Sequence, residues 1–253
     1  MFTLSDRSVA ALSMMVSVVL VAAFVRGPAA LLHRSFPEYA DVDGMPDAVT
    51  SAVRQFLSSP TAALPPELAR LTDYWFQWHA IKIGISVALV MSFAILAAAC
   101  WTRYLSQQGR RAVSYGLAAN LAGILAFLAG WLVAINVQAT AVPLVALLPW
   151  IPPGTLSIDT LVDSPAMTEL LEQVSRYHWV LVVGTGALAA LSVAGSVALW
   201  RRRTAAGSRD RRMFSALLTL TSMNAVAGVL VSTYSMISAM DPAASLRAIL
   251  EMG

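Results

Sequence analysis

Five long runs of apolar residues constrain this chain more than any other feature of its sequence. A helix needs about 20 predominantly apolar residues to cross the hydrocarbon core of a bilayer. The chain is 58% hydrophobic and only 12% charged, whereas soluble domains are about 45–50% apolar. We therefore predict an all-α fold, a polytopic transmembrane helix bundle with five spans at residues 8–25, 81–101, 112–137, 179–200 and 213–237.

The arginines indicate the orientation of these spans. They gather in the loops between the second and third spans and between the fourth and fifth, and basic loops remain in the cytoplasm. Five spans then place the N-terminus inside and the C-terminus outside. Because nearly all basic residues are arginine and alanine is abundant, as in high-GC genomes, we expect a bacterial cytoplasmic (inner) membrane. Topology alone explains the larger cluster, although it could also bind anionic lipid headgroups through Arg201, Arg202, Arg203, Arg211 and Arg212.

The first span has two possible roles. Arg7 precedes the apolar run and Ala22 and Ala23 lie near its end, as in a cleaved signal peptide. The run is longer than a usual signal-peptide core and no clear cleavage site follows, which favours an uncleaved signal anchor. Cleavage would leave four spans. The predicted organisation is a signal anchor or signal peptide (1–25), an outer segment with amphipathic helices (26–78), a transmembrane hairpin (79–137), an outer proline-rich segment (138–177), a second hairpin (178–238) and an outer tail (239–253).

Helix signals also occur outside the spans. A proline at position 46 begins a stretch whose apolar residues recur with helical spacing, so its apolar stripe must lie on the bilayer surface or on another outer segment. Further helices are predicted from Pro65, from Ser164 as N-cap, and after Asp241. In 142–165 a regular helix is forbidden by Pro143, Pro149, Pro152 and Pro153, so the apolar residues there should lie flat in the interface or cap the bundle.

The two hairpins resemble each other. A shift of 99 positions places Pro66 on Pro165, His79 on His178 and Trp101 on Trp200. A tandem repeat explains this match. The alternative is that any helix entering the membrane from outside begins at a proline, carries an aromatic belt and ends with basic residues.

Small residues at four-residue spacing predict where the spans pack together. They form stripes of Gly84, Ala88 and Ser92; of Ala118, Ala122, Ala126 and Gly130; of Gly186, Ala190 and Ala194; and of Asn224, Gly228 and Ser232. Asn120 and Asn224 would be costly in lipid, so we expect both to face inward and to bond across helices.

His79 and His178 are the candidate cofactor ligands. If the hairpins are related by a pseudo-two-fold axis, both rings lie at one depth, as bis-histidine ligation of haem b requires. A metal or a lipid headgroup would be other ligands. The simpler interpretation places both rings in aromatic belts, which need no partner and no cofactor.

The sequence contains no catalytic motif of the phosphate-binding loop, zinc-protease or nucleophile-elbow type. In YWFQWHAIK and NVQATAVPLVALLP it resembles small multi-pass membrane proteins of actinobacteria whose activity is uncharacterised. The resemblance implies no function and no site residue.

Three functions remain open at this point. We expect a noncatalytic accessory or scaffold subunit of a cell-envelope complex, whose partners are membrane lipids and other membrane subunits or a second copy, and not nucleic acid. A bis-histidine haem redox protein is one alternative. The other is a small-molecule or lipid carrier or channel, whose polar path would be lined by Asn120, Asn136, Gln138 and Asn224.

Overall fold

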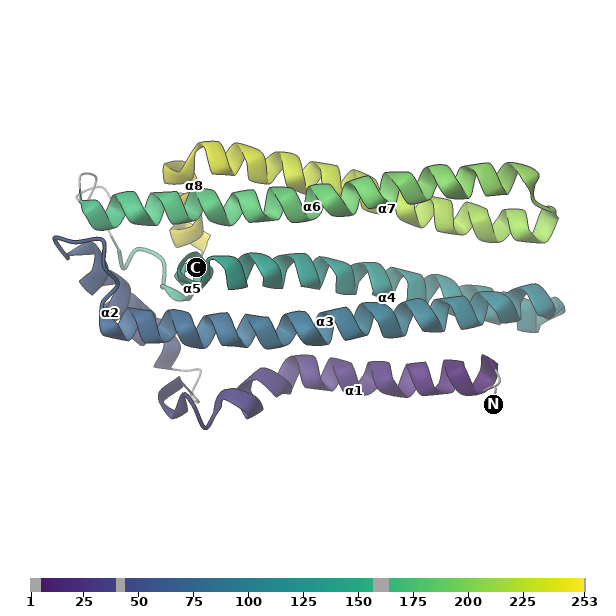
Figure 1. Cartoon of the computed structure of the whole chain (residues 1–253), viewed down its shortest axis with the longest axis horizontal. Helices are drawn as coiled ribbons and strands as arrows, with labels where there is room; N and C mark the ends of the chain where they lie inside the picture. Colours follow the sequence, from purple (N-terminus) through teal and green to yellow (C-terminus); the bar gives the residue numbers. More distant parts are fainter. Residues whose placement is uncertain (1–5, 40–43, 157–163, 253) are drawn as a thin grey trace. The chain divides into compact units, whose positions relative to one another are not determined.

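The computed structural model of the chain describes residues 6–39, 44–156 and 164–252. The regular secondary structure of these residues is entirely helical (Figure 1). Five helices are long enough and apolar enough to cross a membrane, which confirms the predicted number of spans. They are α1 (Asp6–Leu32), α3 (Pro66–Ser106), α4 (Gly109–Ala141), α6 (Pro165–Ala205) and α7 (Ser208–Met240). The shorter elements are η1 (Pro37–Tyr39), α2 (Met45–Leu57), α5 (Pro143–Leu147), η3 (Leu148–Trp150) and α8 (Pro242–Met252).

Two of the long helices have about twice the number of residues that a membrane span needs. α3 and α6 each have 41 residues. At 1.5 Å per residue each is about 60 Å long, twice the thickness of a hydrocarbon core. The predicted spans therefore form only part of each helix. The N-cap of α6 agrees with the sequence, since the Ser164 hydroxyl accepts a hydrogen bond from the Met167 backbone N–H at 3.1 Å.

The long helices are paired by tight connections. α4 and α7 each have 33 residues, and each follows its 41-residue partner after a two-residue gap, so that α3 with α4 and α6 with α7 form hairpins (Figure 1). Gly109, which begins α4, has a φ of 61°, a left-handed conformation that residues other than glycine rarely adopt.

The chain divides into two compact units. Unit 1 comprises Met1–Val25, Ile83–Ala134 and Gly184–Val231. Its described helices expose large apolar side chains to the surroundings, as lipid-facing helices must. Examples from the five long helices are Val19, Met91, Leu117, Leu191 and Met223.

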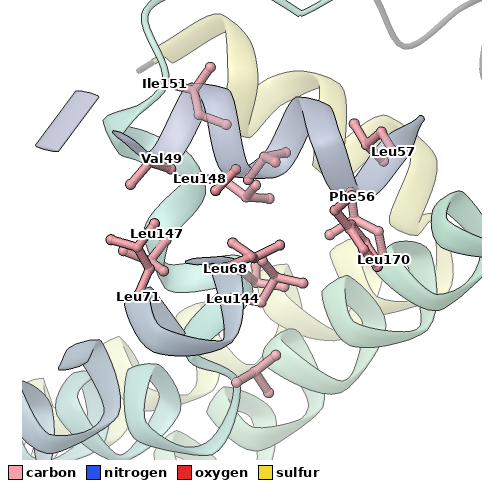
Figure 2. Packing of buried hydrophobic residues seen from close by; sticks show 14 of the residues in the cluster. Val49, Phe56, Leu57, Leu68, Leu71, Leu144, Leu147, Leu148, Ile151 and Leu170 are labelled. Carbon is pink, nitrogen blue, oxygen red and sulfur yellow. The ribbon is translucent and has the colours of Figure 1, made fainter. Parts of the chain in front are cut away.

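Unit 2 comprises Arg26–Lys82, Ile135–Val183 and Ser232–Gly253 and contains the larger apolar core (Figure 2). The apolar stripe of α2 is buried there, with Val49 and Phe56 fully enclosed, so it rests on other segments of the chain and not on an open surface. Its neighbours in the core come from α3, α5, η3, α6 and α8: Leu68, Leu71, Leu144, Leu147, Leu148, Leu170 and Leu246.

The described part of the proline-rich segment, residues 142–156, contains helical turns that its prolines were predicted to forbid. Pro143 occupies the first turn of α5, where a proline needs no N–H donor, and η3 follows directly. Leu144, Val145, Leu147 and Leu148 are buried in the unit 2 core instead of lying flat at an interface. The predicted helix after Asp241 is confirmed as α8. The Asp241 carboxylate caps it by accepting a hydrogen bond from the Ala244 N–H at 3.0 Å.

The predicted packing stripes are partly wrong. In α6, Ala190 and Ala194 are exposed, and the buried face instead carries Thr185, Ala189 and Ser192. Four-residue spacing occurs on several faces of an alanine-rich helix, so spacing alone does not select the packed face. Gly84 and Ala118 are likewise exposed.

In α7 the predicted stripe is confirmed at Gly228. This glycine is buried in unit 1, and a Cβ placed on it would lie 2.9 Å from the Cβ of Ala189 and 3.0 Å from the Thr185 carbonyl oxygen. The two backbones approach closely because no side chain separates them.

We predict that Gly228→Ala lowers the thermal stability of the detergent-purified protein, because the new methyl group meets the backbone of α6. Overpacking of this kind costs about 1–3 kcal/mol. Gly84→Ala is the matched control, since nothing lies within 4 Å of a Cβ at that position. Equal unfolding temperatures for the two variants would contradict the close contact.

Candidate functional site

Asn224 joins three helices within unit 1. Its side-chain amide donates to the Ser192 hydroxyl of α6 at 2.7 Å and accepts a hydrogen bond from the Trp131 indole N–H of α4 at 2.8 Å. The predicted inward orientation and cross-helix bonding of this residue are confirmed. The amide acts as a structural link between the two hairpins.

Asn120 behaves differently. Its side-chain amide donates to the Gly116 carbonyl oxygen of its own helix at 2.8 Å and is only half-buried. The structure shows a bond within α4 in place of the predicted cross-helix bond, because a carbonyl one turn earlier satisfies the amide locally.

His79 lies in unit 2 with one ring nitrogen bonded. Its Nδ1 lies 2.7 Å from the Asn136 side-chain oxygen, and because that oxygen is an acceptor, Nδ1 carries the proton. Nε2 is buried without a hydrogen-bond partner in the described chain, and the ring stands edge-on to Trp75 at 5.0 Å. A histidine oriented by such a bond keeps Nε2 available as an acceptor or metal ligand.

His178 has no such orienting bond. Both of its ring nitrogens are buried and lack a hydrogen-bond partner among the described residues. Its neighbour Tyr177 stacks edge-on at 5.7 Å, while the carbonyl of Tyr177 accepts a hydrogen bond from the Gln138 side chain at 3.0 Å. Among the described residues, no three or more His, Cys, Asp or Glu side chains gather in a group that could hold a metal ion.

An aromatic pocket in unit 2 is a site that the sequence did not reveal. It has a volume of about 470 Å³ and lies between the end of α1, η1 and α3. Its sequence signal is weak because the residues come from segments about 40 positions apart. They are Arg26, His33, Phe36, Tyr39, Tyr74 and Trp78, with Ala29 and Ala30 between the two basic residues.

The electrostatics beside this pocket are defined by an ion pair. The Arg70 guanidinium donates to the Glu38 carboxylate at 2.7 Å. A hydrogen bond from the backbone of Glu38 and the bond from Arg70 lower the pKa of this carboxyl group. The carboxylate therefore stays ionised and remains paired with Arg70. Burial raises the pKa of the Tyr39 hydroxyl, which therefore remains neutral.

A second cavity is an open apolar groove in unit 1, of about 590 Å³, formed by α1, α3 and α4. Its one serine, Ser17, is already bonded to the Ser13 carbonyl at 2.8 Å and to the Ser92 hydroxyl at 2.9 Å. Apolar and small side chains form most of the wall, among them Ala10, Met14, Phe93, Ala118 and Leu121, together with the single cysteine of the chain, Cys100.

The basic loop between α6 and α7 is only partly committed to structure. Arg203 donates to the Ser215 hydroxyl at 2.7 Å and its guanidinium carbon lies 5.4 Å from the centre of the Trp200 ring. Arg201, Arg202, Arg211 and Arg212 are exposed. Arg203 therefore links the ends of α6 and α7, and a role of the four exposed arginines in binding lipid headgroups stays a prediction.

Comparison of the chain with protein-family models, with curated proteins and with solved structures gives no significant match.

Proposed function

We propose that the protein is a noncatalytic integral membrane protein that acts by contact, as an accessory or scaffold subunit of a bacterial cell-envelope complex. The observation that carries the proposal is the open groove of unit 1. Apart from Tyr115, Cys100 and the internally bonded Ser17, the described lining of the groove is apolar, so the groove suits an apolar segment. On the topology that the basic loops favour, the groove lies within the cytoplasmic membrane.

The polar side chains inside the helices support the same proposal. The four amides that a polar path would need, Asn120, Asn136, Gln138 and Asn224, each form a hydrogen bond within the chain. The bonds of Asn136, Gln138 and Asn224 link neighbouring helices and that of Asn120 lies within α4, so each amide is already engaged within the chain. The carrier or channel alternative therefore has less support than a contact function.

A test of the proposal uses two leucines of α4. Leu121 lines the groove and Leu117, one turn away, does not; both are well exposed, at 59% and 68%. A photo-crosslinking diazirine side chain at Leu121 should give one discrete protein adduct in intact membranes, identified by mass spectrometry, and the same group at Leu117 should not. A differently tagged second copy distinguishes self-association from a separate subunit.

Filling the groove provides the matching control. Ala118→Trp should abolish the adduct from Leu121, because the indole occupies the space between α1 and α4. Only lipid adducts at both positions would show that no protein segment occupies the groove, and the contact function at this site would be abandoned.

Haem b ligation is a second candidate function, favoured by the unpaired nitrogens of His79 and His178. If this protein binds haem b, we predict that the protein purified in mild detergent shows a Soret band that shifts on dithionite reduction. His79→Ala and His178→Ala should each remove it, whereas His33→Ala, the remaining histidine of the chain, should retain it. A featureless spectrum from protein produced with ample haem excludes this candidate.

We also infer that the two hairpins are a tandem repeat. α6 and α7 begin and end 99 positions after α3 and α4, and α8 begins 99 positions after α5. Burial supports the same register, since Leu71 and Leu170 are both enclosed, as are Leu147 and Leu246. In this register His79 corresponds to His178, and its partner Asn136 corresponds to Ser235.

The repeat gives a specific prediction for Ser235, whose hydroxyl is buried at 1% exposure without a hydrogen-bond partner in the described chain. Ser235→Asn should supply His178 with the bond that Asn136 gives His79, raising stability by about 0.6 kcal/mol and by no more than about 1.7 kcal/mol, the mean and the maximum measured for cross-helix bonds. Thermal unfolding in detergent measures this change. The gain should vanish in a His178→Ala background, and a gain that persists there would contradict the proposed register.

A further inference from the structure

The walls of the unit 2 pocket form a continuous aromatic surface. The ring centres of Phe36 and Tyr39 are 6.3 Å apart, those of Tyr39 and Tyr74 are 5.1 Å apart, and those of Tyr74 and Trp78 are 5.7 Å apart. Contacts at these distances hold the rings against one another. The surface is therefore preformed and does not need a ligand to assemble it.

The other side of the pocket carries basic groups. Arg26 and His33 are seven positions apart in the chain, with the small residues Ala29 and Ala30 between them, so all four share one side of the segment and leave room in front of it. Among the described residues that line this pocket, none is acidic. The nearby carboxylate of Glu38 is already held by Arg70.

Lys82 adds positive charge beside the same wall, since its ammonium lies 5.3 Å from the centre of the Trp78 ring. Aromatic rings with cations both opposite and beside them suit a ligand with an apolar body and an anionic group. The volume of about 470 Å³ is typical of a small-molecule site. A guanidinium recognises a phosphate through two parallel hydrogen bonds.

The position of the pocket in the chain indicates where such a ligand comes from. Arg26 lies near the end of α1, a helix long enough and apolar enough to span a membrane. Aromatic residues gather at this depth, where the headgroups of lipids meet the hydrocarbon. An amphiphile with its phosphate at the end of a span and its chains beside aromatic rings is a phospholipid.

We propose that this pocket binds one anionic phospholipid, with Arg26 and His33 donating hydrogen bonds to the phosphate. Phe36, Tyr39, Tyr74 and Trp78 contact the glycerol and the first methylene groups. This lipid site is independent of the unit 1 groove and of whichever protein occupies that groove.

The test is a titration of the full chain, purified in a neutral detergent, with phosphatidylglycerol followed by native mass spectrometry. One lipid should bind saturably, and phosphatidylcholine with the same acyl chains should bind more weakly, because its choline cation faces basic side chains. Inorganic phosphate alone should compete only weakly. Competition by inorganic phosphate as strong as by the lipid would make the ligand a free anion and overturn the lipid assignment.

Two matched pairs of variants decide whether the pocket is the site. Arg26→Gln should weaken binding about tenfold, the effect of losing one charge-assisted hydrogen bond. Arg34→Gln removes an equal charge from an exposed residue that does not line the pocket, and should leave binding unchanged. Equal losses in both variants would show general surface attraction and overturn the proposal.

The second pair fills the space without changing the charge. Ala30→Trp places an indole inside the pocket and should abolish the bound lipid, whereas Leu31→Trp, at an exposed position outside the lining, should not. Unfolding temperatures confirm that each variant is folded. Retained binding in a folded Ala30→Trp protein overturns the proposal, and if that variant does not fold, the arginine pair decides the outcome alone.

Discussion

The hydrocarbon of a membrane offers no hydrogen bonds, so every backbone N–H and C=O in it must be paired within the chain. This requirement explains why the five segments that are long and apolar enough to cross a membrane are helical. The hydrocarbon also provides no hydrophobic force between helices, because lipid tails are as apolar as leucine. Within unit 1 the helices are joined instead by close backbone approach at Gly228 and by the bonds of Asn224 to Ser192 and Trp131.

The two units differ in the kind of residue that they bury. The largest fully buried side chains among the described residues all belong to unit 2, including Phe56, Leu68 and Leu170. Unit 1 buries many small side chains, such as Ala119, Ala189 and Thr185. A core of large apolar residues is stabilised by transfer from water, at about 25 cal/mol per Å². The leucine-rich core therefore supports the prediction that much of unit 2 lies outside the bilayer.

Local signals in the sequence were sufficient for the helices but not for their contacts. Span length, prolines in first turns and the caps at Ser164 and Asp241 depend on neighbouring residues, so they could be predicted. The packed face of α6 depends on which helix lies against it, and the stripe of Ala190 and Ala194 was therefore assigned wrongly. The aromatic pocket was missed for the same reason, since Arg26 and His33 meet Tyr74 and Trp78 only in three dimensions.

The two histidines show how one motif can acquire two environments. If the hairpins arose by duplication, the His79 position kept an amide partner in Asn136, whereas the position of the second hairpin that corresponds to Asn136 holds the shorter Ser235. A belt histidine needs no partner on the chain, but burying both nitrogens of His178 without a hydrogen bond costs free energy. A fold that keeps such a group must recover that cost elsewhere or through a bound molecule. A ligand beside His178 would remove this cost, whereas His79 already has a bond to Asn136. The ring of His178 is thus a stronger argument for a bound ligand than the ring of His79.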